Sequence, residues 1–75
     1  MANERPAGPG DVWDMIRRAD DLVKYAPNRD RDTARAQARD QLQRAAAAAE
    51  ALEDRKAGDA LAEQVRIRLS DLENA

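Results

Sequence analysis

Residues 34–72 read ARAQARDQLQRAAAAAEALEDRKAGDALAEQVRIRLSDL, and this stretch decides the fold. Its apolar residues recur every three or four positions, which is the spacing of one face of an α-helix. The repeats form two series, Ala34, Ala38, Leu42, Ala45, Ala49 and Leu52, and then Leu61, Val65, Leu69 and Leu72. Gly58 separates them, and glycine commonly follows the last residue of a helix. We therefore predict helices over residues 30–57 and 60–74.

The rotation between the two series indicates whether they form one helix or two. At about 100° per residue, the series would point about 180° apart on a continuous helix. A chain reversal at Gly58, with Asp59 capping the next helix, places both series on the same side. We favour this hairpin. The alternative is a continuous rod that forms a domain-swapped dimer.

A third apolar series precedes Pro27 and predicts a first helix over residues 12–26. Its members are Val12, Met15, Ile16, Ala19, Leu22, Val23 and Ala26. Asp11 and Asp14 resemble a capping box at its start, and proline disfavours a helical conformation in the residue before it. Residues 1–10 contain two of the three prolines and show no apolar periodicity. We expect a flexible tail over 1–10 and a single helical domain over 11–75.

These boundaries predict an all-α protein, an antiparallel three-helix bundle or hairpin arrangement with a short–long–short order of helices. Alanine supplies 17 of the 75 residues and buries little surface, while phenylalanine is absent. Small chains without disulfides or metals often gain stability by self-association. We therefore expect the chain to partner itself as a two-fold homodimer.

The chain lacks the residue types on which most catalytic chemistry depends. Without cysteine or histidine, it has no disulfide, thiolate ligand, imidazole base or imidazole ligand. Ser70 is the only serine, and no histidine can act as its base. We therefore expect a protein that is not an enzyme, with no catalytic residues, no metal and no cofactor.

The overall composition points to a soluble protein inside a cell. No apolar run has the length of a membrane span, and the N-terminal residues lack the apolar core of a secretory signal. We expect no membrane association and a cytoplasmic location. Arginine outnumbers lysine 11 to 2, which fits a GC-rich bacterial genome. The net charge of −2, with 37% charged residues, indicates a mixed, solvated surface.

Five residues are candidates for contact with a partner, although each also has a simpler structural explanation. Trp13 lies beside its apolar series, where it either anchors a partner or flanks the core; Tyr25 borders the same series as a rim residue. Ala46 and Ala49 belong to an alanine run that either admits a second chain closely or reflects helix propensity alone. Ile67 points away from the apolar series of its helix. It is either an ordinary exposed aliphatic side chain or part of a second interface.

We therefore predict a small non-catalytic helical protein that acts through protein–protein interaction and self-association. A related possibility is an accessory subunit whose apolar groove is filled by a partner's helix.

The alternative is a small nucleic-acid-associated regulator that uses a basic ridge at the start of the second helix, made of Arg29, Arg31, Arg35 and Arg39. Acidic residues are interleaved with this ridge, and no aromatic residue lies nearby to stack on bases. We favour a solvated, ion-paired surface over nucleic-acid contact.

Overall fold

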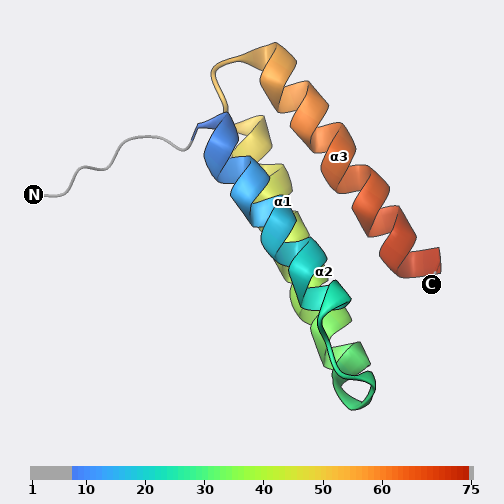
Figure 1. The fold of residues 1–75 in the computed structure, drawn as a ribbon. Helices are drawn as coiled ribbons and strands as arrows, with labels where there is room; N and C mark the ends of the chain where they lie inside the picture. The colour runs from blue at the N-terminus through green and yellow to red at the C-terminus, as the bar shows by residue number, and fades with distance from the viewer. Residues whose placement is uncertain (1–7, 75) are drawn as a thin grey trace, which may run out of the picture.

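The computed structural model describes residues 8–74, which form three α-helices and one short 3-10 turn. Helix α1 spans Pro9–Lys24, η1 spans Asn28–Asp30, α2 spans Arg31–Glu50 and α3 spans Arg55–Asn74. These described residues contain no β-strand. Helix α2 runs antiparallel to both α1 and α3 (Figure 1). The prediction of an all-α fold with three packed helices is confirmed.

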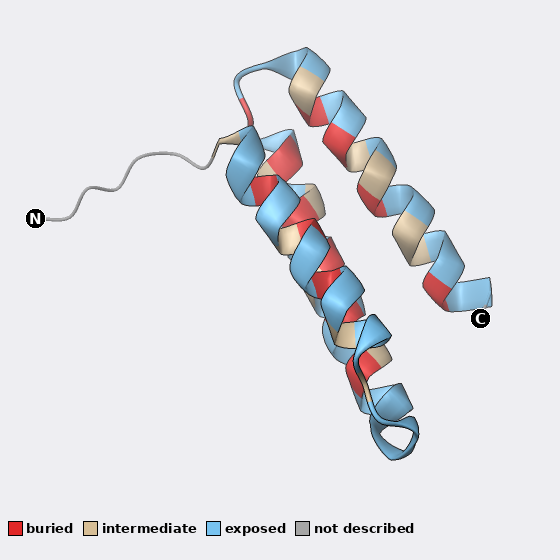
Figure 2. Cartoon of the chain, viewed as in Figure 1, coloured by how far each residue is buried: buried red, intermediate tan, exposed pale blue. Residues whose placement is uncertain are grey.

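The core is built from the three apolar series. All six members of the second series are buried, and the other two series supply Val12, Ile16 and Ala19 and then Leu61, Val65 and Leu72. The buried residues lie on the inner sides of the helices, while exposed residues cover the outer sides (Figure 2). Val23 is an exception in the first series, because 41% of its surface remains exposed. The helical spacing therefore predicts correctly which face of each helix packs inward.

Helix α2 is the central element, because α1 and α3 each pack along it and contact each other far less. The resulting body is flat, with extents of 40 × 30 × 14 Å. Its radius of gyration is 13.2 Å, compared with roughly 11 Å expected for a compact domain of this length. The three helices therefore form an open slab.

The chain reverses between α2 and α3, but several residues earlier than the sequence predicted. Helix α2 ends at Glu50 and α3 begins at Arg55, so the predicted helices over 30–57 and 60–74 are wrong at these ends. The predicted short–long–short order is also wrong, because α1 has 16 residues while α2 and α3 have 20 each. Leu52 completes the buried series of α2 from within the connecting turn.

The N-cap of α3 is Asp54 and not the predicted Asp59. Its Oδ1 atom accepts a hydrogen bond from the Ala57 N–H at 3.1 Å, and its carbonyl oxygen accepts one from the Gly58 N–H at 2.9 Å. The Oδ1 bond satisfies a donor that the first turn would otherwise leave unpaired, and the carbonyl bond is the first bond of the helical ladder, so together they fix the start of the helix. Asp59 lies within the first turns of α3, on its exposed side.

Gly58 lies inside α3, where it packs against α2, and it does not form a turn. None of the described glycines has a positive φ, so Gly58 is not the left-handed residue that ends a helix. A Cβ atom at this position would lie 2.7 Å from the Ala49 carbonyl oxygen. Glycine is therefore required because α3 crosses the backbone of α2 in close contact.

Helix α1 begins earlier than predicted, and Asp11 caps it from within the first turn. Gly8 is the N-cap residue, and its N–H donates to Asp11 Oδ2 at 2.8 Å. Pro9 takes the first helical position, where its missing N–H would have no partner in any case. Pro9 and Gly10 are therefore helical, contrary to the predicted tail, and residues 1–7 of that tail lie outside the described residues.

Replacing Gly58 with alanine should destabilise the protein. Overpacking of this kind costs about 1–3 kcal/mol, which exceeds the gain of about 1 kcal/mol that alanine brings over glycine within a helix. We expect the midpoint of thermal unfolding, followed by circular dichroism, to fall by about 4–8 °C. Gly10→Ala is the control: a Cβ there has no atom within 4 Å, so the midpoint should stay or rise. An unchanged or higher midpoint for Gly58→Ala would contradict the close approach.

The two candidate caps of α3 can be distinguished by alanine substitution. Asp54→Ala should lower the free energy of unfolding by about 1 kcal/mol, because it removes the N-cap hydrogen bond. Asp59→Ala changes an exposed side chain on the same helix and should alter it by less than about 0.5 kcal/mol. Urea denaturation at neutral pH measures both values. The opposite ranking would favour a helix that starts after Gly58.

Candidate interaction surface

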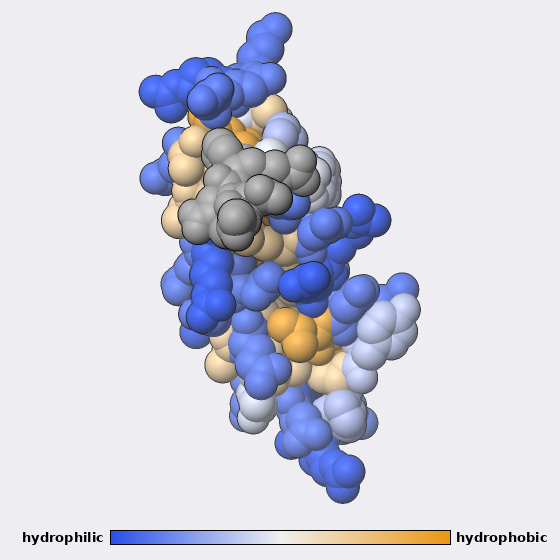
Figure 3. Space-filling view, turned by 90° about the vertical axis from the view of Figure 1, so that its left-hand side faces the viewer, coloured by the Kyte–Doolittle hydropathy of each residue, from blue (hydrophilic) through white to orange (hydrophobic). Residues whose placement is uncertain are grey.

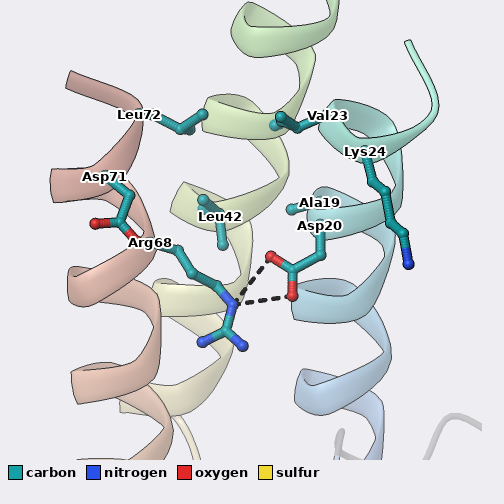
Figure 4. A pocket seen from close by; sticks show the side chains of 9 residues that line it. Ala19, Asp20, Val23, Lys24, Leu42, Arg68, Asp71 and Leu72 are labelled. Atoms are coloured by element: carbon teal, nitrogen blue, oxygen red, sulfur yellow. Dashed lines mark hydrogen bonds and ion pairs between the residues drawn. The ribbon is translucent and has the colours of Figure 1, made fainter. Parts of the chain in front are cut away.

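A hollow lies between α1 and α3, with α2 as its floor (Figure 4). We call it the α1–α3 groove, and its volume is about 280 Å³. It is lined by Ala19, Asp20, Val23, Lys24, Ala38, Leu42, Arg68, Asp71 and Leu72. Five of these residues are apolar and four are charged. The groove therefore joins an apolar interior to a rim that carries both signs of charge.

The apolar part of the groove exists because short side chains stand among long ones. Ala19 on α1 and Ala38 on α2 are buried but fill little space. Val23, Leu42 and Leu72 project from α1, α2 and α3 around the opening that these alanines leave (Figure 4). Val23 is the member of this group that the fold leaves substantially exposed. Removing it from water would be favourable.

Arg68 connects α3 to α1 across the groove. Its Nε–H is shared between Asp20 Oδ1 and Oδ2, at 3.0 and 3.1 Å (Figure 4). Its Nη1 donates to the side-chain and backbone oxygens of Gln64, at 2.8 and 3.2 Å. The guanidinium carbon also lies 5.9 Å from the centre of the Trp13 ring, within range of a cation–π contact. These contacts hold the two walls of the groove together.

The exposed members of the predicted interaction set lie at separate places. Trp13 is 39% exposed, and its ring contacts Arg68 of the same chain. Tyr25 is 70% exposed and lines a different hollow, beside the start of α2. Ile67 is exposed on α3 but does not line the α1–α3 groove. Hydrophobic residues reach the face seen in Figure 3 only in limited areas of a largely hydrophilic surface. The structure therefore does not gather these residues into one patch.

Ala46 and Ala49 of the alanine run are covered mainly by other residues of the same chain. Ala49 is buried beneath α3, with its carbonyl oxygen facing Gly58, so its own chain already covers this residue. Ala46 is half-buried and packs against the core. The small side chains do allow two helices to approach closely, as the sequence indicated. The helices concerned are α2 and α3 of one chain.

The fold uses part of the predicted basic ridge. Arg35 is half-buried, and its Nη2 donates to the Leu72 carbonyl oxygen at the C-terminal end of α3. A cation is favourable at this end of a helix, where carbonyl groups lack partners within the helix. Arg29, Arg31 and Arg39 are exposed. One of the four arginines therefore serves to join α2 to α3.

Sequence reasoning missed Val23, Arg68 and Asp71 as members of a common surface. Val23 belongs to the first apolar series, so its spacing predicts a buried residue. Arg68 and Asp71 are charged positions beside the series of α3, and their relation to α1 depends on the tertiary arrangement. A partial signal was available, because Asp20 and Arg68 have opposite charges and each lies next to an apolar series.

No group of three or more acidic side chains in residues 8–74 is arranged to hold a metal ion. No helix in that range combines the length and apolar character needed to cross a membrane. Comparison with protein-family models, curated proteins and solved structures finds no match.

Arg68→Ala should loosen the contact between α1 and α3. We expect the free energy of unfolding to fall by about 1 kcal/mol, because the Asp20 and Trp13 contacts are lost. Fluorescence offers a local measurement, since Trp13 is the only tryptophan and its emission should shift to longer wavelength as the ring loses cover. The control is Arg66→Ala, which removes only an exposed ion pair with Glu63 on the same helix. Equal effects of the two substitutions would contradict a bridging role for Arg68.

Proposed function

We propose that this protein is a non-catalytic interaction module whose α1–α3 groove binds an α-helix of a protein partner. The observation that carries this proposal is the exposed Val23 beside an apolar hollow with a charged rim. Amphipathic helices bind such grooves by inserting their apolar face and leaving their polar face at the rim. The groove has the same division between an apolar interior and a polar edge.

The arrangement of the helices supports binding of a helix more than binding of an extended peptide. Helices α1 and α3 run in the same direction, and both lie against α2 (Figure 1). A helix laid into the groove would contact both walls and complete a four-helix arrangement. An extended peptide would need an open sheet edge to pair its backbone, and the described residues contain none.

The surroundings of the hydroxyl groups support a role without catalysis. Ser70 Oγ accepts a hydrogen bond from Asn74 Nδ2 at 3.4 Å, and an amide cannot remove its proton. The alternative function, nucleic-acid binding by the basic ridge, has less support. Arg35 already bonds to α3, and Asp30 and Asp32 lie among the remaining arginines.

Photochemical cross-linking can test the groove directly. A photoreactive amino acid in place of Val23 should form a specific adduct with a protein when the full chain is irradiated in a lysate of its native cells. The matched control replaces Tyr25, which is more exposed but lines a different hollow, beside the start of α2. Mass spectrometry would identify the adduct. An absent adduct at position 23, or a stronger one at position 25, would contradict the proposal.

A further inference from the structure

We propose that the partner that covers the α1–α3 groove is a second copy of this chain, related to the first by a two-fold axis that runs along the groove. Helices α1 and α3 of that copy lie over the two walls, in place of a single helix laid between them. This inference rests on the proposed function of the groove as the binding surface. It names the partner and the symmetry of the complex. Three features support it, namely the charges at the rim, the exposed Val23 and the flatness of the slab.

Two opposite charges on the rim lack ion-pair partners among the residues that the structure describes. Lys24 lies on the α1 side of the groove and Asp71 on the α3 side (Figure 4). Neither Lys24 nor Asp71 takes part in an ion pair among residues 8–74. Lys24 makes a ring contact with Tyr25, whose ring centre lies 5.3 Å from the Lys24 Nζ. Asp20 and Arg68 neutralise each other across the groove. The remaining rim therefore carries one positive wall and one negative wall.

A two-fold axis along the groove makes these walls complementary to themselves. It exchanges the two walls, so Lys24 of each copy faces Asp71 of the second copy. Because a two-fold interface forms every contact twice, two such ion pairs would result. An axis across the groove would instead place each charged residue opposite its own equivalent. Like charges in that position repel, so the charges select the first geometry.

The apolar residues favour the same geometry. The axis along the groove sets α1 of one copy against α3 of the other. The exposed side chain of Val23 then meets the wall of the second groove that carries Leu72. This contact would remove from water the apolar surface that a single chain leaves exposed.

The shape of the slab provides enough area for a dimer. Its broad face measures 40 by 30 Å, while a typical interface buries about 800 Å² of each partner. Two slabs joined at this face would give a two-layered body with a shared core, the arrangement in which helical domains usually bury their apolar faces. A single slab 14 Å thick lacks that second layer.

Charge reversal tests the proposal on the purified full chain. Sedimentation equilibrium should give a mass of twice 8.3 kDa for the wild type. Lys24→Glu and Asp71→Lys should each raise the dissociation constant of the dimer at least about tenfold, because each creates two like-charge contacts. The double variant should return to within about threefold of the wild type, because its walls have exchanged signs. The control is Lys56→Glu, which changes the net charge by the same amount as Lys24→Glu, at an exposed position outside the groove.

Each outcome bears on the proposal. A wild-type chain that stays monomeric up to about 1 mM overturns it, as does a double variant that associates no better than the single ones. Recovery in the double variant cannot arise from misfolding, and circular dichroism checks each single variant. A monomeric chain that still forms a position-23 adduct with a different protein would overturn the dimer and leave the groove as a binding surface. Loss of both results would overturn both proposals.

Discussion

The contact between Gly58 and the Ala49 carbonyl oxygen determines how α3 approaches the other helices. With no Cβ between them, α3 lies directly on the backbone of α2 near the turn that connects them. Arg35 and Arg68 hold the later part of α3, through the Leu72 carbonyl oxygen and the Asp20 carboxylate. Because α3 is fixed along α2 in this way, it stands beside α1 instead of covering it, and the groove is the space between them.

The sequence predicted the packing faces well because burial follows helical periodicity, and the periodicity of α2 is uninterrupted from Ala34 to Leu52. It misplaced the turn because local signals around residue 58 are ambiguous. A glycine can end a helix, or it can allow a neighbouring helix to approach closely, and both roles require a residue without a Cβ atom. Only the position of the neighbouring helix distinguishes the two roles. Asp54 and Asp59 are likewise both able to cap a helix. Because Gly58 packs against α2 from inside α3, Asp54 precedes the helix and caps it, while Asp59 lies within it.

The groove could not be predicted for a different reason. Asp20 and Arg68 are 48 residues apart, and their pairing follows from the placement of α1 relative to α3. Val23 and Ala19 belong to the same apolar series, yet Val23 is exposed and Ala19 is buried, because the neighbouring helices cover one position and not the other. Periodicity identifies the face of a helix, but the extent to which a neighbour covers that face is a tertiary property.

The groove also has a thermodynamic consequence. Larger residues at Ala19 and Ala38 could fill the hollow from within one chain, and the added apolar burial would stabilise that chain. If a partner binds at the groove, its apolar surface would supply this stabilisation instead. Binding to the folded chain alone shifts the unfolding equilibrium toward the folded state, so stability rises with the concentration of the partner. If the partner is the chain itself, folding and association become linked. Arg68 then contributes to both, because it fixes the spacing of the walls that a second copy would contact.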